Sequence, residues 1–283
     1  MSALSSSAHL PSDAASTSDR VARGAFRFHA ALVYLFLYLP ILVVVVYAFN
    51  ENRLAQVWHG FSTRWFLEAW RDETLRRAFR LSVLTAAGNG VVATVLGTAA
   101  AMGLRNVGRR TRTAFDALMY MALIVPEIVI AIASLLFFVT INFPLGPTAI
   151  VATHAVFNTS LVTLIVRARL AGMDRSLEEA SADLGAGRWG SFRQVTLPQL
   201  FPAVLAGALL AFTFSFDDVI LSSFVSGPGS TTLPVEIFSQ LRFGLTPKIN
   251  VVAVGTLTIT LTAIVAAQVL LRREARRALE GRR

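Results

Sequence analysis

Residues 178–198 read EEASADLGAGRWGSFRQVTLP and form a polar, mixed-charge island between two long apolar runs. Just before them, Ser176 is a favoured N-cap residue, and Glu179 three positions later completes a capping box. The pattern therefore predicts a short helix that begins at Ser176. Gly185 is expected to end this helix, because glycine adopts the left-handed C-terminal conformation without a steric cost.

A second short helix is predicted over residues 188–195, and Pro198 suits the first turn of the helix that follows. The segment is thus expected to form two short amphipathic helices, joined by a glycine bend and lying at a membrane surface. From the residues alone, an ordinary connecting loop with a capped helix explains the pattern as well as a functional element does.

The composition indicates an integral membrane protein. Of 283 residues, 54% are hydrophobic and only 15% are charged, and the mean hydropathy is +0.60. The net charge of +9 comes from arginines beside apolar runs, which favours a role in membrane orientation over nucleic-acid binding. The chain has no cysteine, so disulfides, thiol nucleophiles and zinc–thiolate sites are excluded.

Six apolar runs reach or approach the roughly 20 residues that a helix needs to span a bilayer. Arginine clusters precede the first run and follow the second, fourth and sixth, so they fall in alternate loops. The positive-inside rule then predicts an all-α fold with six transmembrane helices and both termini in the cytoplasm. The expected spans are residues 30–49, 81–104, 115–140, 148–166, 199–216 and 249–271.

The remaining segments are expected to flank these spans. Residues 1–29 begin with a Ser/Ala-rich stretch without apolar periodicity, which predicts a disordered cytoplasmic tail. A cleavable signal peptide is the alternative, but the following apolar run is long and lacks a small-residue cleavage site. Residues 50–76 are expected to be periplasmic, with an amphipathic helix at residues 64–71, and residues 272–283 form a basic cytoplasmic tail.

Acidic residues within or beside the apolar runs are candidate functional groups. Glu127 follows a proline inside the third run, where it either faces a water-filled path or marks an interfacial helix break. Asp217 and Asp218 end the fifth run and Glu236 follows, so they are candidates for a cation pathway or for helix capping. His154 is expected to pack through hydrogen bonds rather than bind a metal, because no second ligand lies four residues on.

The polar island resembles the EAA motif of ABC importer permeases, the binding-protein-dependent or MetI-like family. That motif is Glu-Ala-Ala, three residues, Gly, nine residues, then Ile-x-Leu-Pro. The spacing here is the same, and Ser181 and Val195 are the two departures. In the family this loop is the cytoplasmic coupling helix that docks on an ATPase subunit. The resemblance assigns this role to Glu179, Ala180, Ser181, Gly185, Val195, Leu197 and Pro198.

The resemblance also implies a permease domain over residues 77–271 and a set of partners. These are ABC ATPase subunits, a second permease subunit and an extracytoplasmic solute-binding protein, in the bacterial inner membrane. ATP and Mg²⁺ would be bound by the ATPase partner, and no cofactor or metal by this chain. This agrees with the absence of a Walker phosphate loop from the sequence.

A second stretch, residues 214–229, resembles the corresponding segment of spermidine/putrescine permeases of the PotC-like type, as does the segment 166–170. The resemblance implies polyamine uptake, and carboxylates along the path would offset the cost of dehydrating a polycation. The candidates are Glu127, Asp217, Asp218 and Glu236. A permease for another small cationic or polar solute is the first alternative.

Two other classes of protein are less well supported by the sequence. An ion-coupled secondary transporter would use Glu127 and the aspartate pair as carriers, but it has no use for an EAA-type loop. A membrane enzyme is disfavoured, because the sequence contains no catalytic constellation such as His-Glu-x-x-His or Gly-x-Ser-x-Gly. The expected function is therefore transport rather than catalysis by this chain.

Overall fold

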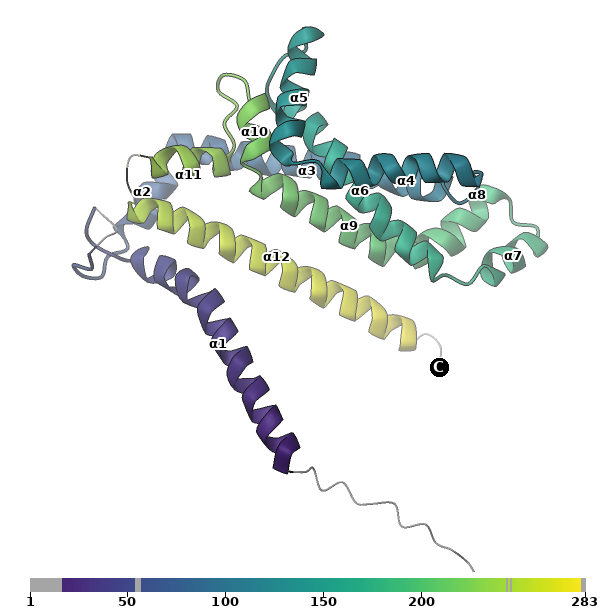
Figure 1. Ribbon diagram of the computed structural model, residues 1–283, viewed down its shortest axis with the longest axis horizontal. Coiled ribbons are helices and arrows are strands. Elements are labelled where there is room, and N and C mark those ends of the chain that lie inside the picture. Colours follow the sequence, from purple (N-terminus) through teal and green to yellow (C-terminus); the bar gives the residue numbers. More distant parts are fainter. Residues whose placement is uncertain (1–16, 54–56, 243, 245, 281–283) are drawn as a thin grey trace, which may run out of the picture.

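The computed structural model describes residues 17–53, 57–242, 244 and 246–280, and this part of the chain is helical apart from its connections (Figure 1). The only bridge of β type there pairs Asn50 with Phe61. The helices are α1 (Thr17–Tyr47), α2 (Arg64–Arg71), α3 (Glu73–Gly103), α4 (Arg109–Ile124), α5 (Glu127–Thr140), α6 (Pro147–Ala171), α7 (Ser176–Asp183), α8 (Arg188–Ser191), the π-helical turn η1 (Phe192–Thr196), α9 (Leu197–Asp217), α10 (Ile220–Val225), α11 (Leu233–Leu241) and α12 (Pro247–Glu280).

The core of the molecule is a bundle of three long helices, α3, α6 and α9, which pack along one another. Their interface is rich in small and β-branched side chains. Such residues let helix backbones approach closely, and in a membrane this packing replaces the hydrophobic effect as the source of association. The buried residues of this interface are Ala93, Ala101, Val162, Val166, Leu170, Leu200 and Ala211.

Two glycines make room for Val162, which is completely buried at the centre of the bundle. A Cβ atom at Gly97 of α3 would lie 2.7 Å from the Val162 Cβ and 3.0 Å from the Thr159 carbonyl oxygen. A Cβ atom at Gly207 of α9 would lie 3.1 Å from a Val162 methyl group. Glycine at both places is therefore what allows three helices to meet around one valine.

Four helices in the described part of the chain are long and apolar enough to cross a membrane, and a bent pair raises the number to five. The four are Arg23–Tyr47, Glu73–Gly103, Pro147–Ala171 and Arg188–Asp217. The predicted sixth span falls on α12, of which several side chains lie outside the described residues. The all-helical membrane class is confirmed.

The third predicted span, residues 115–140, is not one straight helix. It consists of α4 and α5, which meet at an angle of 104° (Figure 1). Pro126 cannot donate a backbone hydrogen bond, and it pushes Val125 out of the helical region, to a ψ of 130°. The break therefore lies at the expected place, but it turns the chain far more sharply than an interruption within a span would.

The prediction of a disordered tail over residues 1–29 is wrong for its second half. Helix α1 begins at Thr17, whereas residues 1–16 lie outside the described residues. The polar residues before the apolar run have ordinary helix propensities and continue the helix without a break, so composition alone placed the boundary too late. The predicted basic tail, residues 272–283, likewise continues α12 as far as Glu280.

The end of the bundle near α2 is held together by polar contacts. The predicted amphipathic helix at residues 64–71 is confirmed as α2. The indole Nε1 of Trp65 donates to the Asn50 carbonyl oxygen at 2.8 Å. Asp72 caps α3 by accepting from the Thr74 amide, and its other carboxylate oxygen accepts from Lys248 Nζ at 2.6 Å. These contacts tie α1, α2, α3 and α12 together at one end.

Replacing Gly97 with alanine tests the packing around Val162. The new methyl group cannot be accommodated without moving either α6 or the Val162 side chain, and we expect destabilisation by roughly 1–3 kcal/mol. The measurement is the thermal unfolding midpoint of the purified protein in detergent. The matched control is Gly103→Ala in the same helix, where no atom lies within 4 Å of the added Cβ. Equal midpoints for the two variants would contradict the close-packed interface.

Candidate functional site

The polar island forms the far end of the molecule, where α7 and α8 project beyond the bundle (Figure 1). Gly185 ends α7 in the left-handed conformation, with a φ of +83°. The Ala186 amide donates to the Ser181 carbonyl oxygen, and the Gly185 amide donates to that of Ala182. This pair of hydrogen bonds is a Schellman motif. The predicted role of Gly185 as the residue that ends the helix is confirmed.

The predicted capping box is wrong. Ser176 is the first residue of α7 rather than its N-cap, and the side chain of the N-cap residue, Arg175, makes no hydrogen bond to the helix. The Asp174 carboxylate instead accepts from the Ser176 amide at 2.9 Å. Asp174 does what Ser176 was expected to do, because an aspartate two residues earlier bonds to the chain equally well. This leaves Glu179 free of any capping role.

Three large apolar side chains are exposed on α7 and on the residues that follow it. None of the α7 side chains is buried. Leu184 is 88% exposed and Trp189 is 72% exposed, and Leu177 of α7 is also open. Glu179 and Ala180 are exposed as well. The segment is therefore accessible for contact with another protein.

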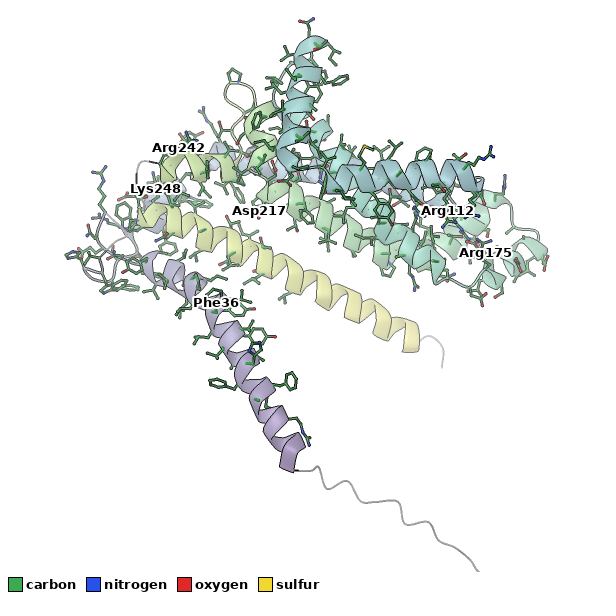
Figure 2. The ribbon with its side chains drawn as sticks, in the orientation of Figure 1. Phe36, Arg112, Arg175, Asp217, Arg242 and Lys248 are labelled. Carbon is green, nitrogen blue, oxygen red and sulfur yellow. The ribbon has the colours of Figure 1, made fainter. Side chains whose placement is uncertain are left out.

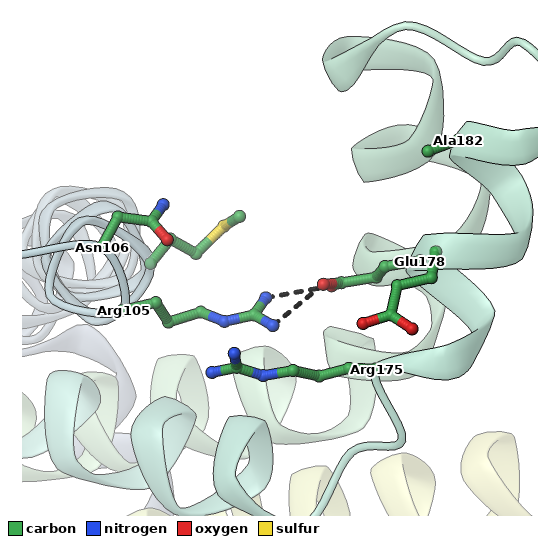
Figure 3. A pocket seen from close by; sticks show the side chains of 7 residues that line it. Arg105, Asn106, Arg175, Glu178 and Ala182 are labelled. Atoms are coloured by element: carbon green, nitrogen blue, oxygen red, sulfur yellow. Dashed lines mark hydrogen bonds and ion pairs between the residues drawn. The ribbon is translucent and has the colours of Figure 1, made fainter.

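Glu178, rather than Glu179, attaches α7 to the bundle (Figure 3). Both of its carboxylate oxygens accept from the Arg105 guanidinium, each at 2.9 Å. One of them also accepts from Thr196 Oγ1 at 2.8 Å. Arg105 follows the end of α3 and Thr196 precedes α9, so one carboxylate joins three segments. Only about a fifth of each charged side chain in the pair is exposed, 18% for Arg105 and 24% for Glu178.

The electrostatics of this contact set its pH dependence. The hydrogen bonds from Arg105 hold the pKa of Glu178 below its ordinary value of 4.5, and burial opposes this only in part. A carboxylate with a lowered pKa stabilises the fold above its unfolded-state pKa, and this contribution disappears as the pH falls through the folded-state value. The attachment of α7 is therefore complete at neutral pH and weakens only in strongly acidic solution.

The segment from α8 to α9 is one continuous helical path. The predicted second helix at residues 188–195 is present as α8 followed by the π-helical turn η1, which leads directly into α9. Pro198 lies in the first turn of α9, where its missing N–H is not needed. Val195 and Leu197 are half-buried, and the Val195 carbonyl oxygen accepts from Gln199 Nε2 at 3.1 Å. The loop is thus joined rigidly to a membrane-spanning helix.

Three of the four predicted pathway acids lie at one pocket near the middle of the molecule, where α9 meets α10 and α5 begins (Figure 2). The pocket has a volume of about 480 Å³. Its lining residues are Glu127, Leu210, Thr213, Phe214, Asp217, Asp218, Val219 and Ile220. The sharp turn between α4 and α5 brings Glu127 to this place. Glu236 is not part of the pocket, and its carboxylate accepts from Gln240 within α11.

Asp218 has a well-defined structural role at this pocket. It accepts from the amides of Leu221 and Ser222 and so caps α10. It also lies 3.2 Å from His154 Nε2, and the other ring nitrogen of His154 lies 2.7 Å from Ser215 Oγ. The expectation that His154 packs through hydrogen bonds is confirmed. Among the described residues, no three His, Asp or Glu side chains are grouped to hold a metal ion.

Residues 93–278 match the family model described as "Binding-protein-dependent transport system inner membrane component". The match covers the last part of α3, all of α6 and α9, the polar island and both pocket aspartates. The chain belongs to this family. Its expected membership, inferred from the EAA-like spacing, is thereby confirmed, and the family consists of transport permeases of the inner membrane rather than enzymes.

Curated relatives and solved structures agree with this family. The putrescine transport system permease protein PotI of Escherichia coli K12 is 42% identical over 78% of this chain and 82% of its own length. The spermidine/putrescine permease PotC of the same strain is 34% identical over 89% of this chain and 95% of its own length.

Among solved structures, a bacterial ABC transporter that imports alginate gives a TM-score of 0.75 at 14% identity, covering 90% of this chain and 96% of the other. A bacterial alginate ABC transporter in complex with an alginate pentasaccharide-bound periplasmic protein gives a TM-score of 0.67 at 14% identity, covering 87% of this chain and 93% of the other. These likenesses establish the ABC permease fold.

Exchanging the charges of Arg105 and Glu178 tests the attachment of α7. Either single reversal, Arg105→Glu or Glu178→Arg, places like charges together and frees α7, whereas the double variant restores an opposite-charge pair. A hydrogen bond to a charged group contributes roughly 1.5–3 kcal/mol, so we expect amide exchange in α7 to accelerate at least about tenfold in each single variant. Hydrogen–deuterium exchange on the protein in nanodiscs measures this.

The control for this experiment is Arg110→Glu, which reverses an exposed arginine of α4 and should leave α7 unchanged. Recovery of slow exchange in the double variant is the decisive result. If the double variant exchanges as fast as the single variants, the ion pair is not what holds α7.

Proposed function

We propose that this chain is a membrane-spanning subunit of an ATP-driven importer of polyamines such as putrescine and spermidine. The observation that carries the proposal is the similarity to PotI and PotC over most of both chains. The pocket lined by Glu127, Asp217 and Asp218 supports it, because carboxylates beside the path lower the cost of dehydrating a polycation. Specificity would be shared with an external binding protein.

We further propose that the chain crosses the membrane six times, with both termini in the cytoplasm. The four single spans, the bent pair and α12 would make up the six. Arg112 and Arg175 lie at the end of the molecule that carries α7, whereas Arg242 and Lys248 lie at the opposite end (Figure 2). The larger number of arginines at the α7 end supports its placement in the cytoplasm. The permease domain would then occupy residues 77–271.

In this proposal the coupling element is α7 with the turn that follows it. Glu179 and Ala180 on its exposed surface would contact the ATPase partner, together with Ser181. Gly185 would shape the turn, and Val195, Leu197 and Pro198 would join the element to α9. Because Glu178 fixes α7 to α3 and α9, a push on α7 would move the helices of the bundle as a unit.

The partners follow from this assignment. Two ATPase subunits would bind ATP and Mg²⁺, and a second permease subunit would complete the path. A periplasmic solute-binding protein would deliver the cargo, by analogy with the alginate transporter that was solved together with its alginate-bound periplasmic protein. ATP-driven closure of the ATPase pair would switch the path between its inward-open and outward-open forms.

Uptake of labelled putrescine and spermidine tests the proposal in cells that express the complete operon. Glu179→Arg should reduce uptake at least about tenfold. Docking on the ATPase would bury the new positive charge either beside another positive charge or without an opposite charge to pair with. Gly185→Ala should also impair uptake, because its φ of +83° is strained for alanine, whereas Gly187→Ala, at a φ of −65°, serves as the matched control.

The outcomes separate the two parts of the proposal. Normal uptake by Glu179→Arg, with the protein inserted at wild-type levels, would contradict the coupling role. Absence of uptake of both polyamines in the wild type would contradict the cargo and leave the family membership intact. The cargo would then be sought among other small cationic or polar solutes.

Neutralising the pocket carboxylates tests the pathway. Asp217→Asn and Glu127→Gln should lower the maximum uptake rate about fivefold or more, because each removes a charge that stabilises a dehydrated ammonium group. The half-saturating concentration should stay the same, since the binding protein sets it. Glu236→Gln lies outside the pocket and is the contrasting variant. Loss of uptake in Glu236→Gln alone would place the path elsewhere.

A further inference from the structure

A second pocket lies near the α7 end of the molecule, between the ends of α3, α6 and the first turn of α4. Its volume is about 100 Å³. Half of its lining residues are arginines, and the others are apolar. The lining residues are Ala101, Leu104, Arg105, Arg112, Arg167, Leu170, Ala171 and Arg175.

Two of the four arginines form ion pairs, and the charges of the other two act on the same two carboxylates without forming an ion pair. Arg105 is paired with Glu178, and Arg167 is paired with Asp116 of α4. Among the described residues, no hydrogen bond or ion pair reaches the guanidinium group of Arg112 or Arg175. The pocket therefore keeps an excess of two positive charges. Arg105 and Arg175 extend from opposite sides beside the Glu178 carboxylate (Figure 3), and both also line this pocket.

The chemistry of the lining suits a phosphate group. Guanidinium groups bind phosphate oxygens through two parallel hydrogen bonds, and Arg is weakly hydrated and gives up water readily. Arg112 is the one lining residue that comes from α4, where it lies in the first turn.

The place of the pocket in the fold indicates where the phosphate comes from. Its lining residues lie in the last turns of the spans Glu73–Gly103 and Pro147–Ala171, just after them or, for Arg112, in the first turn of α4. Lipid headgroups lie at the ends of membrane spans. Arg175, the N-cap residue of α7, also lines a neighbouring pocket with Glu178 and Glu179, so the two regions meet at this arginine. Further along α4, an exposed apolar strip offers a surface for acyl chains; it consists of Phe115, Leu118, Met121 and Ile124.

We propose that this pocket binds the phosphate of an anionic phospholipid, such as phosphatidylglycerol, through Arg112 and Arg175. The site rests on the membrane placement proposed above but not on the cargo. Because Arg105 lines the pocket and also binds Glu178, a lipid phosphate bound there lies next to the contact that holds α7. Basic pockets between membrane helices are known to bind such headgroups.

Lipid titration of the assembled transporter tests this proposal. Native mass spectrometry in detergent would count bound phosphatidylglycerol, with phosphatidylcholine as the neutral lipid and inorganic phosphate as the soluble anion. The wild type should bind one phosphatidylglycerol per copy of this chain more tightly than the others. The double variant Arg112→Gln/Arg175→Gln should weaken binding roughly 25-fold, at about fivefold for each charge.

The matched control is Arg109→Gln/Arg110→Gln, which removes the same charge from exposed arginines of α4 outside the pocket. Its affinity should stay within about twofold of the wild type. An equal loss in the control would mean diffuse attraction and overturn the site. Equal occupancy by inorganic phosphate would overturn the lipid assignment. Loss of the ATPase subunit from Arg112→Gln/Arg175→Gln, with lipid binding unchanged, would mean that these arginines bind an acidic partner surface instead.

Discussion

The close approach of α3, α6 and α9 around Val162 is the constraint on which the other features of this protein depend. Two glycines, Gly97 and Gly207, remove the side chains that would keep these helices apart. The packing fixes where α3 ends and where α9 begins. It thereby places Arg105 and Thr196 close enough to bind the same carboxylate of Glu178. The polar end of the molecule is thus positioned by contacts within the apolar core.

The two regions to which we assign a function lie at different positions along the same bundle. The carboxylate pocket lies where α9 gives way to α10, and the surface that we assign to coupling lies at the opposite end of α9. A single helix, continuous with η1 and α8, connects them. This gives a direct physical route by which a force on α7 would reach the pocket, because packed helices move as rigid elements rather than deform.

Spacing and composition predicted much of this architecture. The apolar runs, the break at Pro126, the helix of residues 64–71 and the role of Gly185 all follow from local chain chemistry. The roles that only the tertiary structure reveals belong to residues whose partners lie far away in the sequence. Glu178 and Glu179 are neighbouring glutamates of the same helix. Only the position of Arg105, 73 residues away from Glu178, shows which of the two attaches α7 to the bundle. The 104° turn was missed for the same reason, since the packing of α5 on α10 sets its size.

Cross-linking from the exposed face of α7 tests most directly whether this face contacts the ATPase. The chain has no native cysteine, so single cysteines can be introduced without background. A cysteine at Leu184, which is 88% exposed, should cross-link to the ATPase subunit in membranes. A cysteine at Trp70, which is 74% exposed at the other end, should not. Cross-linking from Trp70, or its absence from Leu184 in an assembled and active transporter, would contradict the coupling role of α7.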